Sequence, residues 1–510
     1  MNQIFSKPLA ASLLSILCGL AVPFSFAPHR IVFVEVFSIA CMLLLVKLHS
    51  RRFACWLWCL FGLGMFGYGV WWIQVSVHQF GLPLYSFSVT VTAGLIVIQA
   101  LHLGLFGALA HRFGQSGAIA PALIGIPACW VLIEFLRSWF ASGFPWLLLG
   151  YAHTNSLLAG FAPLGGVYLV SYAVVFLAAS VVVFLTRRDA PGLVPIVLLI
   201  AGAYGLNMIS WQENSSAERL RATLVQGAVP QEIKWHPEVR QPSIDLYRQL
   251  SEAHWQNDVI IWPETAIPAY ADEVPGVLAS LASRANTEQT VLLVGMATRA
   301  PIKNPGERRP YFNSLVRIGG QGSEQASSIT ARYDKRHLVP FGEYMPFDAI
   351  LRPITDLLSV PMSDFSKGAS NKVTITAGDM IFGTSICYED AYAGLLRDAL
   401  PAANVLVNIS NDAWFGATIA PHQHLQISQM RALELGRYML RATNTGISAV
   451  INERGGLEAV SQQFKPEALS AEFKLFSGLT PFARFGSVPI FIWCLLCLVV
   501  LHFRARDTTS

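Results

Sequence analysis

Cys387 has the position in the sequence that nucleophilic chemistry requires. It is the single cysteine between residues 210 and 486, so it cannot form a disulfide within that stretch. It directly follows the apolar run Met380–Ile386, which predicts a buried strand. A side chain at the carboxyl end of a strand lies at the rim of a sheet, where α/β enzymes place their reacting groups. A core cysteine is the other interpretation of a lone thiol, and the strand-end position favours the nucleophile.

Two charged side chains share this layout. The predicted strand 258–262 is followed by Glu264, and the predicted strand 327–333 is followed by Lys335. A free cysteine has a pKa of about 8.5, so little of it is thiolate at neutral pH. A carboxylate can accept the thiol proton, and an ammonium group stabilises both the thiolate and the oxyanion that forms when sulfur attacks a carbonyl. We therefore predict Glu264 as general base, Lys335 as electrostatic stabiliser and Cys387 as nucleophile.

The elements that must hold these residues alternate between strands and helices over residues 210–486. This alternation indicates a layered α/β fold. Further strands are predicted at 221–226, 290–296, 311–318, 372–376, 403–409 and 446–451, and helices at 241–255, 275–285, 388–399 and 422–440.

Composition separates this stretch from the rest of the chain. Of the 510 residues, 53% are hydrophobic and only 13% are charged, whereas soluble domains carry about 25% charged residues. These values exclude a disordered chain, a coiled coil and an ordinary soluble enzyme. The net charge of +4 is too balanced for a dedicated nucleic-acid binder, so we expect no nucleic-acid partner.

The apolar residues gather in stretches that are long enough to cross a bilayer, which takes about 20 residues. They predict an α-helical transmembrane bundle of about eight spans, with seven spans in residues 1–209, a catalytic domain at 210–486, and a final span with a cytoplasmic tail at 487–510. A signal peptide is the alternative for the first stretch, because Ser25-Phe26-Ala27 fits a small-x-small cleavage site. The eight stretches are 8–27, 31–48, 54–77, 87–110, 117–136, 162–186, 192–209 and 487–503.

Basic residues in the short loops predict the orientation of the bundle. With a cytoplasmic N-terminus, the opposite side holds only Arg30 and Arg137. Seven crossings then place the 210–486 domain outside the cytoplasm, and the eighth returns the C-terminus to it. The cytoplasmic side holds Lys7, Lys47, Arg51, Arg52, Arg112, Arg187, Arg188, Arg504 and Arg506.

Other polar and apolar features give weaker signals. Glu134 and Arg137 are three residues apart on one helix face and are predicted to pair inside the bundle. His422 and His424 could suggest a metal, but no third ligand is near, so we predict surface or capping roles and no metal. Residues 338–365 are unusually apolar for a loop. They form either a core segment or a lid that shields the site from water.

Three motifs at these strand ends resemble the nitrilase superfamily. They are Trp262-Pro263-Glu264, the run from Tyr333 to Glu343, and Ile386-Cys387-Tyr388-Glu389, in the order in which that superfamily has them. The resemblance implies an αββα sandwich with a Glu-Lys-Cys triad.

Taken with the apolar spans, the whole chain resembles the apolipoprotein N-acyltransferase family of the bacterial inner membrane. The resemblance includes Pro23–Pro28, Phe144–Trp146, the stretch from Gln226 to Trp235, and Asn408–Gly416. It implies that the sn-1 acyl chain of a phospholipid, typically phosphatidylethanolamine, moves through a Cys387 thioester to the α-amine of a diacylglyceryl-modified N-terminal cysteine of apolipoproteins. It places the catalytic domain on the periplasmic side and both termini in the cytoplasm. We expect no cofactor, and nothing in the sequence requires more than a monomer.

Four residues beside the triad are predicted to support it. The motifs give Glu343 an orienting role toward Lys335 or Glu264, and Glu389 a supporting role beside the nucleophile. Tyr388 is predicted to pack there and to give its backbone N–H to the oxyanion. Trp235 is predicted either to contact lipid or to fill the core.

Two other functions remain open at this level. A membrane-anchored amidase or nitrilase would use the same triad with water as second nucleophile, although eight spans serve no purpose for a soluble substrate. A transporter with an outer regulatory domain would place several polar residues inside the spans, and this chain has few.

Overall fold

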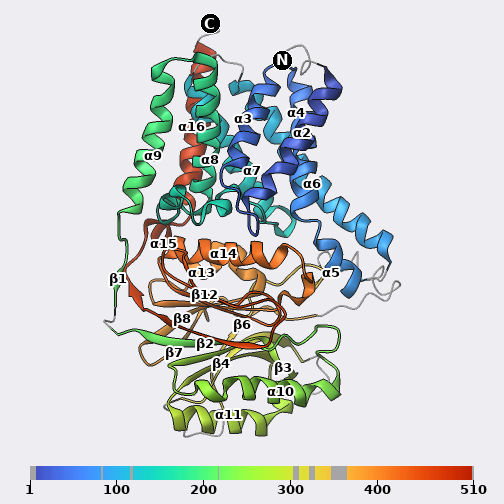
Figure 1. Ribbon diagram of the computed structural model, residues 1–510, viewed down its shortest axis with the longest axis vertical. Helices are drawn as coiled ribbons and strands as arrows, with labels where there is room; N and C mark the ends of the chain where they lie inside the picture. Colours follow the sequence, from blue (N-terminus) through green and yellow to red (C-terminus); the bar gives the residue numbers. More distant parts are fainter. Residues whose placement is uncertain are drawn as a thin grey trace. The chain divides into compact units, whose positions relative to one another are not determined.

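Two compact units make up the chain in a computed structural model (Figure 1). One unit contains Met1–His78, Pro83–Ser210 and Thr480–Ser510, and the other contains Gln79–Leu82 and Trp211–Leu479. The structure describes residues 7–81, 84–114, 119–215, 218–301, 309–320, 328–345 and 364–507.

The first unit is a helical bundle whose helices are apolar over most of their length. Short 3-10 turns interrupt it, and a π-helical turn at Pro121–Gly125 precedes α7 where Pro121 and Pro127 stand in the sequence. The helices are α2 (Pro8–Ala21), α3 (Val34–Val46), α4 (Arg51–Gly69), α5 (Ile73–Phe80), α6 (Tyr85–Gly114), α7 (Ile126–Trp139), α8 (Ala162–Arg187), α9 (Val194–Asn207), α15 (Pro481–Phe485) and α16 (Val488–Asp507).

Each predicted apolar stretch contains helix in the described residues, but not every helix is long enough to span a bilayer alone. Five are long and apolar enough, and the pair α4 and α5, bent by 56°, makes a sixth if it is one span. The helices at Val34–Val46 and Val488–Arg504 are apolar but shorter. The bundle thus has membrane character, and the number of eight spans stays a prediction.

Buried charges in this unit are paired, as predicted for Glu134 and Arg137. The Arg137 guanidinium lies 4.0 Å from the Glu134 carboxylate, and both side chains are almost fully buried. Arg137 also donates to the carbonyl oxygens of Trp146 and Leu147, at 2.6 and 2.9 Å. The pair therefore satisfies non-helical backbone that could not find water inside an apolar bundle.

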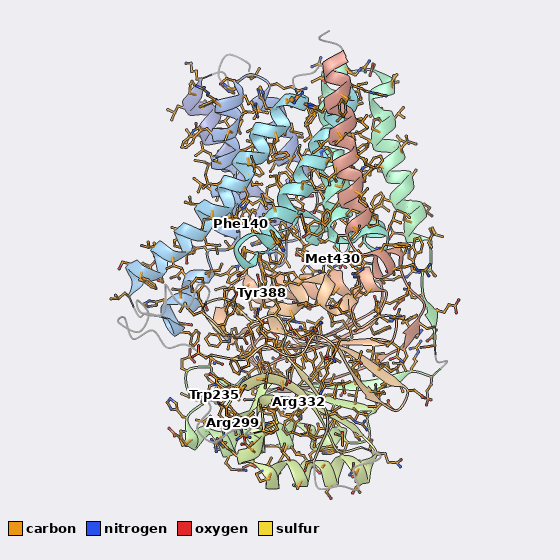
Figure 2. The ribbon with its side chains drawn as sticks, turned by 180° about the vertical axis from the view of Figure 1, so that it is seen from behind. Phe140, Trp235, Arg299, Arg332, Tyr388 and Met430 are labelled. Atoms are coloured by element: carbon orange, nitrogen blue, oxygen red, sulfur yellow. The ribbon has the colours of Figure 1, made fainter. Side chains whose placement is uncertain are left out.

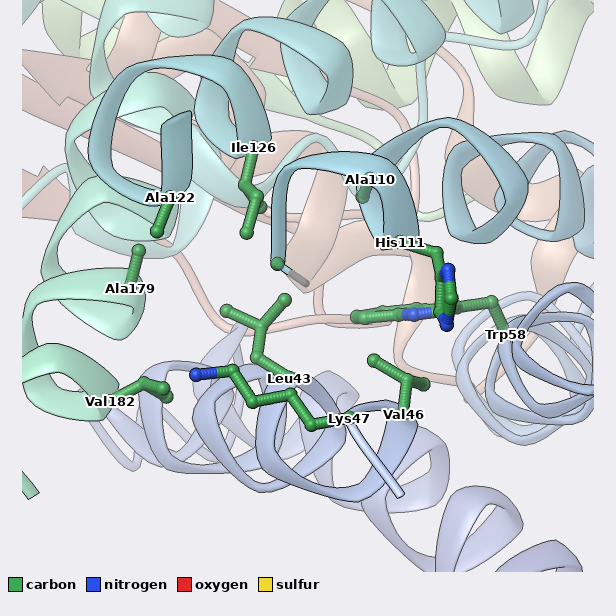
Figure 3. Close-up of a pocket in the computed structure, with 11 residues that line it drawn as sticks. Leu43, Val46, Lys47, Trp58, Ala110, His111, Ala122, Ile126, Ala179 and Val182 are labelled. Carbon is green, nitrogen blue, oxygen red and sulfur yellow. The ribbon is translucent and has the colours of Figure 1, made fainter. Parts of the chain in front are cut away.

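A small cavity lies among α3, α4, α6, α7 and α8 (Figure 3). Its volume is about 20 Å³, and Lys47 and His111 belong to a lining that is otherwise mostly apolar. A space of this size holds about one water molecule, so it cannot take an acyl chain.

The second unit contains two six-stranded sheets. In the first sheet the order is β13-β2-β3-β4-β5-β6, and in the second it is β12-β11-β10-β9-β8-β7. A two-stranded pair of β1 (Glu213–Asn214) and β14 (Phe476–Ser477) joins the two ends of the unit. The strands are β2 (Leu220–Gln226), β3 (Val259–Tyr270), β4 (Val291–Arg299), β5 (Tyr311–Ile318), β6 (Ile329–Asp334), β7 (Thr374–Ala377), β8 (Met380–Ile386), β9 (Val405–Ser410), β10 (Met439–Thr443), β11 (Ala449–Ile451), β12 (Leu457–Val460) and β13 (Glu467–Phe473).

The sheets pack face to face and helices cover their outer faces (Figure 1). Side chains from both sheets, among them Leu224, Ile261, Phe382 and Val407, form the central core. Helices α10 (Pro237–Ser251) and α11 (Pro275–Glu288) close a second core over the first sheet, and α13 (Ala393–Arg397) and α14 (Ala420–Leu435) cover the second sheet. This is the αββα sandwich that the nitrilase resemblance implies.

Several predicted elements differ from those observed. The predicted helix 422–440 is wrong beyond Leu435, because Gly436 adopts a left-handed backbone that ends α14 and strand β10 follows. The predicted helix 388–399 is instead a 3-10 turn, Cys387–Ala391, followed by α13. Strands β12 and β13 have no predicted counterpart. Most of the predicted lid, residues 346–363, lies outside the described residues.

Gly295 in β4 allows close contact with the part of β3 that carries Glu264. A Cβ atom there would lie 2.2 Å from the Pro263 carbonyl oxygen and 2.7 Å from the Glu264 Cα. We expect Gly295→Ala to lower the free energy of unfolding by about 1–3 kcal/mol, as overpacking does in other cores. Thermal unfolding checks this. Gly276→Ala in α11 is the control, because a Cβ there meets nothing within 4 Å, and an equal loss in both variants would contradict the argument.

Candidate active site

The structure brings the three predicted reactive residues together at one edge of the sandwich. Strands β3 and β6 run in the same direction in the first sheet, so Glu264 and Lys335 lie at the same edge. Cys387 follows β8 of the second sheet. The Lys335 Nζ lies 3.9 Å from the Glu264 Oε1, and both charges influence the Cys387 thiol. All three side chains are buried.

Glu264 does not stand after the end of its strand, as predicted, but within an irregular part of it. Pairing between β3 and β4 shifts register between Trp262 and Ile267, and Thr265 adopts a left-handed φ of 49°. The irregular backbone lets β3 continue to Tyr270 after Glu264. Asn313 of β5 fixes the carboxylate, since its Nδ2 donates to the Glu264 Oε1 at 2.6 Å.

Cys387 occupies a sharp turn between β8 and the following 3-10 turn. Its φ of 53° is left-handed, a conformation that costs a non-glycine residue about 1–3 kcal/mol unless its surroundings hold it. The Asn408 Nδ2 donates to the Cys387 carbonyl oxygen at 3.2 Å, and the Ser410 hydroxyl hydrogen-bonds the thiol. The neighbouring strand β9, which carries both residues, thus holds Cys387 in place.

Glu389 connects the Cys387 turn to the Lys335 loop. Its carboxylate is fully buried and accepts hydrogen bonds from the backbone N–H groups of Ile386, Arg336 and His337, at 2.8, 2.6 and 2.9 Å. It also accepts a hydrogen bond from the Tyr333 hydroxyl at 2.8 Å. One side chain therefore fixes the distance between the elements that carry the thiol and the ammonium.

Glu343 plays the matching part for Lys335. Its carboxylate lies 2.9 Å from the Lys335 Nζ and accepts the backbone N–H of Val339 at 2.8 Å. Asn313 bridges the two acids, because it also donates to the Glu343 Oε1 at 3.1 Å. The orienting role predicted for Glu343 is consistent with these contacts.

The electrostatics favour proton transfer between buried groups. Burial, reinforced by the Glu264 charge, raises the pKa of the Cys387 thiol, so the resting sulfur keeps its proton. Burial also raises the pKa of Glu264, against the opposing charge of Lys335. Burial acts to lower the pKa of Lys335, but the charges of Glu343 and Glu264 outweigh it and raise that pKa. Lys335 is thus a cation beside the thiol, and the raised pKa of Glu264 makes its carboxylate a better proton acceptor than an exposed one.

Tyr388 and Trp235 differ in their surroundings (Figure 2). Tyr388 is half-buried and accepts a hydrogen bond from the Tyr392 hydroxyl at 3.1 Å. Trp235 is 44% exposed, which excludes the core role that the sequence left open for it. Phe341, in the Lys335–Glu343 loop, is 60% exposed.

Comparison with known sequences decides the family. The apolipoprotein N-acyltransferase N-terminal domain profile matches residues 18–180, and the carbon-nitrogen hydrolase profile matches residues 221–477. An apolipoprotein N-acyltransferase of Vibrio cholerae is 37% identical over 509 residues, covering 99% of both chains. The chain belongs to the apolipoprotein N-acyltransferase family. A relative of the same name from Methylococcus capsulatus is 37% identical over 510 residues, covering 98% of both chains.

Solved structures that resemble this apolipoprotein N-acyltransferase family member cover about half of it. A Saccharomyces cerevisiae nitrilase-superfamily protein, Nit3, is 16% identical with a TM-score of 0.37, and the match covers 51% of this chain and 93% of Nit3.

Two polar residues at the candidate site of this apolipoprotein N-acyltransferase family member were not predicted from the sequence. Asn313 lies mid-strand in β5, where its amide has no sequence signal of a role. Lys234 is almost fully buried and donates to the Glu264 backbone carbonyl at 3.1 Å. Burial lowers the pKa of Lys234 to about 7. The available sequence signal for a buried Lys234 was its position next to Trp235, because of two adjacent loop residues one can be buried while the other is exposed.

The prediction of surface or capping roles for the histidines is wrong for His424. Its ring is buried and lies between the carboxylates of Asp390 and Asp412, at 2.9 and 2.8 Å. Among the described residues of this apolipoprotein N-acyltransferase family member, no group of three or more His, Cys, Asp and Glu side chains is arranged to hold a metal ion.

We expect Glu389→Gln to weaken both fold and reaction. The Gln amide would put N–H donors where the carboxylate accepts four hydrogen bonds, leaving at least one buried backbone donor unpaired. That costs about 1–3 kcal/mol of unfolding free energy, measurable by thermal denaturation alongside the acyl-transfer rate. Glu472→Gln, which removes an exposed ion pair with Arg219, is the control and should change neither. Equal behaviour of the two variants would refute the connecting role of Glu389.

Proposed function

We propose that this chain transfers the sn-1 acyl chain of a phospholipid to the α-amine of the diacylglyceryl-modified N-terminal cysteine of apolipoproteins. The supporting observation is a buried Cys387, Lys335 and Glu264 set at one sandwich edge, in a chain that matches named apolipoprotein N-acyltransferases over nearly its whole length. The apolar helical unit on the same chain suits two lipid-anchored substrates.

The first half-reaction makes a thioester on Cys387. Glu264 takes the thiol proton as the sulfur attacks the sn-1 ester carbonyl, and the Lys335 ammonium and the Tyr388 backbone N–H stabilise the oxyanion. The carbon–oxygen ester bond then breaks. Glu264 returns the proton to the departing oxygen, and a lysophospholipid leaves with a free hydroxyl group.

The second half-reaction consumes the thioester. The α-amine of the lipoprotein cysteine attacks the thioester carbonyl and loses a proton to Glu264. The carbon–sulfur bond breaks, an amide forms, and the Cys387 thiolate takes back its proton. Because burial raises the pKa of the Cys387 thiol, the departing sulfur depends on the Lys335 cation, which favours the thiolate, and on the proton that Glu264 returns.

The membrane unit raises the local concentration of both substrates. Confining an enzyme and two lipid-anchored reactants to one bilayer turns encounters in solution into encounters at an interface. The bias of basic residues supports a bacterial inner-membrane protein with about eight spans, a periplasmic catalytic domain and cytoplasmic termini. A monomer contains every residue that the two half-reactions use. The acyl donor is proposed to be of the phosphatidylethanolamine type.

The acyl-enzyme provides the direct test. Incubation with a phospholipid labelled in its sn-1 chain should add one acyl mass to the Cys387 peptide, released by hydroxylamine. Cys387→Ala should lose the adduct and all transfer to a diacylglyceryl peptide, whereas Cys129→Ala, in α7 of the helical unit, should keep both. Lys335→Met should slow adduct formation by about 100-fold or more, since it removes an oxyanion partner. Hydrolysis of a small amide without transfer to the peptide would favour the amidase alternative instead.

The orientation has its own test. Alkaline phosphatase inserted after residue 300, between β4 and β5, should be active. A fluorescent protein that reports a cytoplasmic location should give no fluorescence at the same position. The same reporters placed at the C-terminus should behave in the opposite way. A cytoplasmic signal from residue 300 would overturn the predicted topology and leave the chemistry unaffected.

A further inference from the structure

A cluster of four charged side chains lies buried behind the nucleophile and takes no part in the two half-reactions. It consists of Asp390, His424, Asp412 and Arg441, none of which is more than 1% exposed. The four come from different elements, namely the 3-10 turn after Cys387, helix α14, the 3-10 turn Asp412–Phe415 and strand β10. A buried group of this size costs free energy unless its charges balance, so its arrangement needs a reason.

The two carboxylates around the histidine favour its charged form. The His424 Nε2 lies 2.9 Å from the Asp390 Oδ1, and its Nδ1 lies 2.8 Å from the Asp412 Oδ1. A carboxylate accepts hydrogen bonds, so each ring nitrogen has an acceptor for a proton, and the two negative charges favour the imidazolium over the opposing charge of Arg441, whose Nη2 lies 2.9 Å from the Nδ1. Arg441 completes the set with contacts of 3.2 Å to Asp390 and 3.0 Å to Asp412. With two cations and two carboxylates, the net charge of the cluster is then zero.

The cluster reaches the nucleophile by three routes. The His424 Nε2 lies 3.3 Å from the Cys387 carbonyl oxygen. The Ser410 hydroxyl, which hydrogen-bonds the thiol, donates to the Asp412 Oδ1 at 3.0 Å. The Arg441 Nη1 donates to the Asn408 Oδ1 at 2.6 Å, and Asn408 in turn holds the Cys387 carbonyl. Any change in the charge of the cluster is therefore felt at the sulfur.

We propose that His424 is a positioning residue for the nucleophile, whose imidazolium cancels the carboxylate charge behind Cys387 and holds the left-handed turn in place. Without that cation the cluster would carry one net negative charge. The Asp412 carboxylate already opposes ionisation of the thiol, and losing its partner would strengthen that opposition. The inference rests on the proposed function only in taking Cys387 as the reacting thiol.

The surroundings of His424 also predict how the cluster responds to pH. The charged groups that face it in the described residues are Asp390, Asp412 and Arg441, with Ser428 of its own helix donating to Asp390. Burial and Arg441 act to lower the pKa of His424, but the two carboxylates outweigh them and raise it to about 9. Because the pKa of His424 is higher in the folded than in the unfolded state, protonation of His424 stabilises the folded state. This stabilisation is fully present below about pH 6.5, the ordinary pKa of histidine, and is lost as the pH rises through about 9.

Alkylation of Cys387 by iodoacetamide tests the proposal without any acyl substrate. In the full-length protein, followed by mass spectrometry of the Cys387 peptide from pH 7 to 10, His424→Gln should react about tenfold more slowly at pH 8. Its rate profile should shift by about one pH unit to higher pH. The double variant His424→Gln/Asp412→Asn restores the charge balance and should recover to within about threefold of the unmodified protein. His254→Gln, whose ring contacts Ser470 elsewhere in the unit, is the control.

Each outcome decides the matter. A His424→Gln profile identical to that of the unmodified protein, or slow alkylation that the double variant does not recover, would overturn the proposal. If His424→Gln does not fold, the unmodified protein still tests the proposal, because its thermal unfolding midpoint should decrease as the pH rises from 6.5 to 9.5. This decrease should be smaller in the double variant. The expected alkylation pattern together with normal acyl transfer by Cys387→Ala would instead count against the proposed function and leave this inference standing.

Discussion

The catalytic unit depends on burying charge without leaving it unpaired. Moving an ionised side chain into a protein interior costs several kcal/mol, and the cost is offset only by good geometry and hydrogen bonds. Lys335 lies against two carboxylates, and Glu389 accepts four hydrogen bonds. The pairing that keeps the sandwich folded is the same pairing that orients the reacting groups, so stability and chemistry share their residues.

The same constraint explains the backbone at Cys387. A left-handed cysteine persists only where neighbouring groups hold it, and here strand β9, Glu389 and the His424 cluster each contact the turn or its flanks. These contacts hold the Cys387 turn, while the charges of Glu264 and Lys335 act on its thiol.

The sequence indicated Cys387, Glu264 and Lys335 together with their motif neighbours Glu343 and Glu389, but not the supports that come from distant parts of the chain. Each of the first three was predicted from a position just after a predicted strand, although the structure places Glu264 within β3. The buried role of His424 was not predicted because its partners, Asp390 and Asp412, lie 34 and 12 residues away along the chain and meet it only when α14 packs on the second sheet.

The helices and strands that were predicted wrongly or not at all have causes that can be named. The helix predicted at 422–440 extends past Gly436. A glycine is a sequence signal for the end of a helix, and here it adopts the left-handed backbone that ends α14. Strand β13 escaped notice because most of its residues, in the run Glu467–Phe473, are only partly buried and lack a clear apolar alternation. Asn313 could not be assigned a role, because its two carboxylate partners come from strand β3 and from the loop after β6, which lie far from it in the sequence.

The short pair of β1 and β14 has an evolutionary consequence. The first and last residues of the sandwich run antiparallel to each other, and β13 pairs with β2, so the polypeptide enters and leaves the fold at neighbouring points. A module with adjacent ends can be inserted into a host gene without forcing apart the host's own helices. Within the helical unit, α16 accordingly packs against α7 and α8, which precede the insertion. Neighbouring ends of this kind are what a gene insertion between the helix at Val194–Asn207 and the helix at Pro481–Phe485 requires.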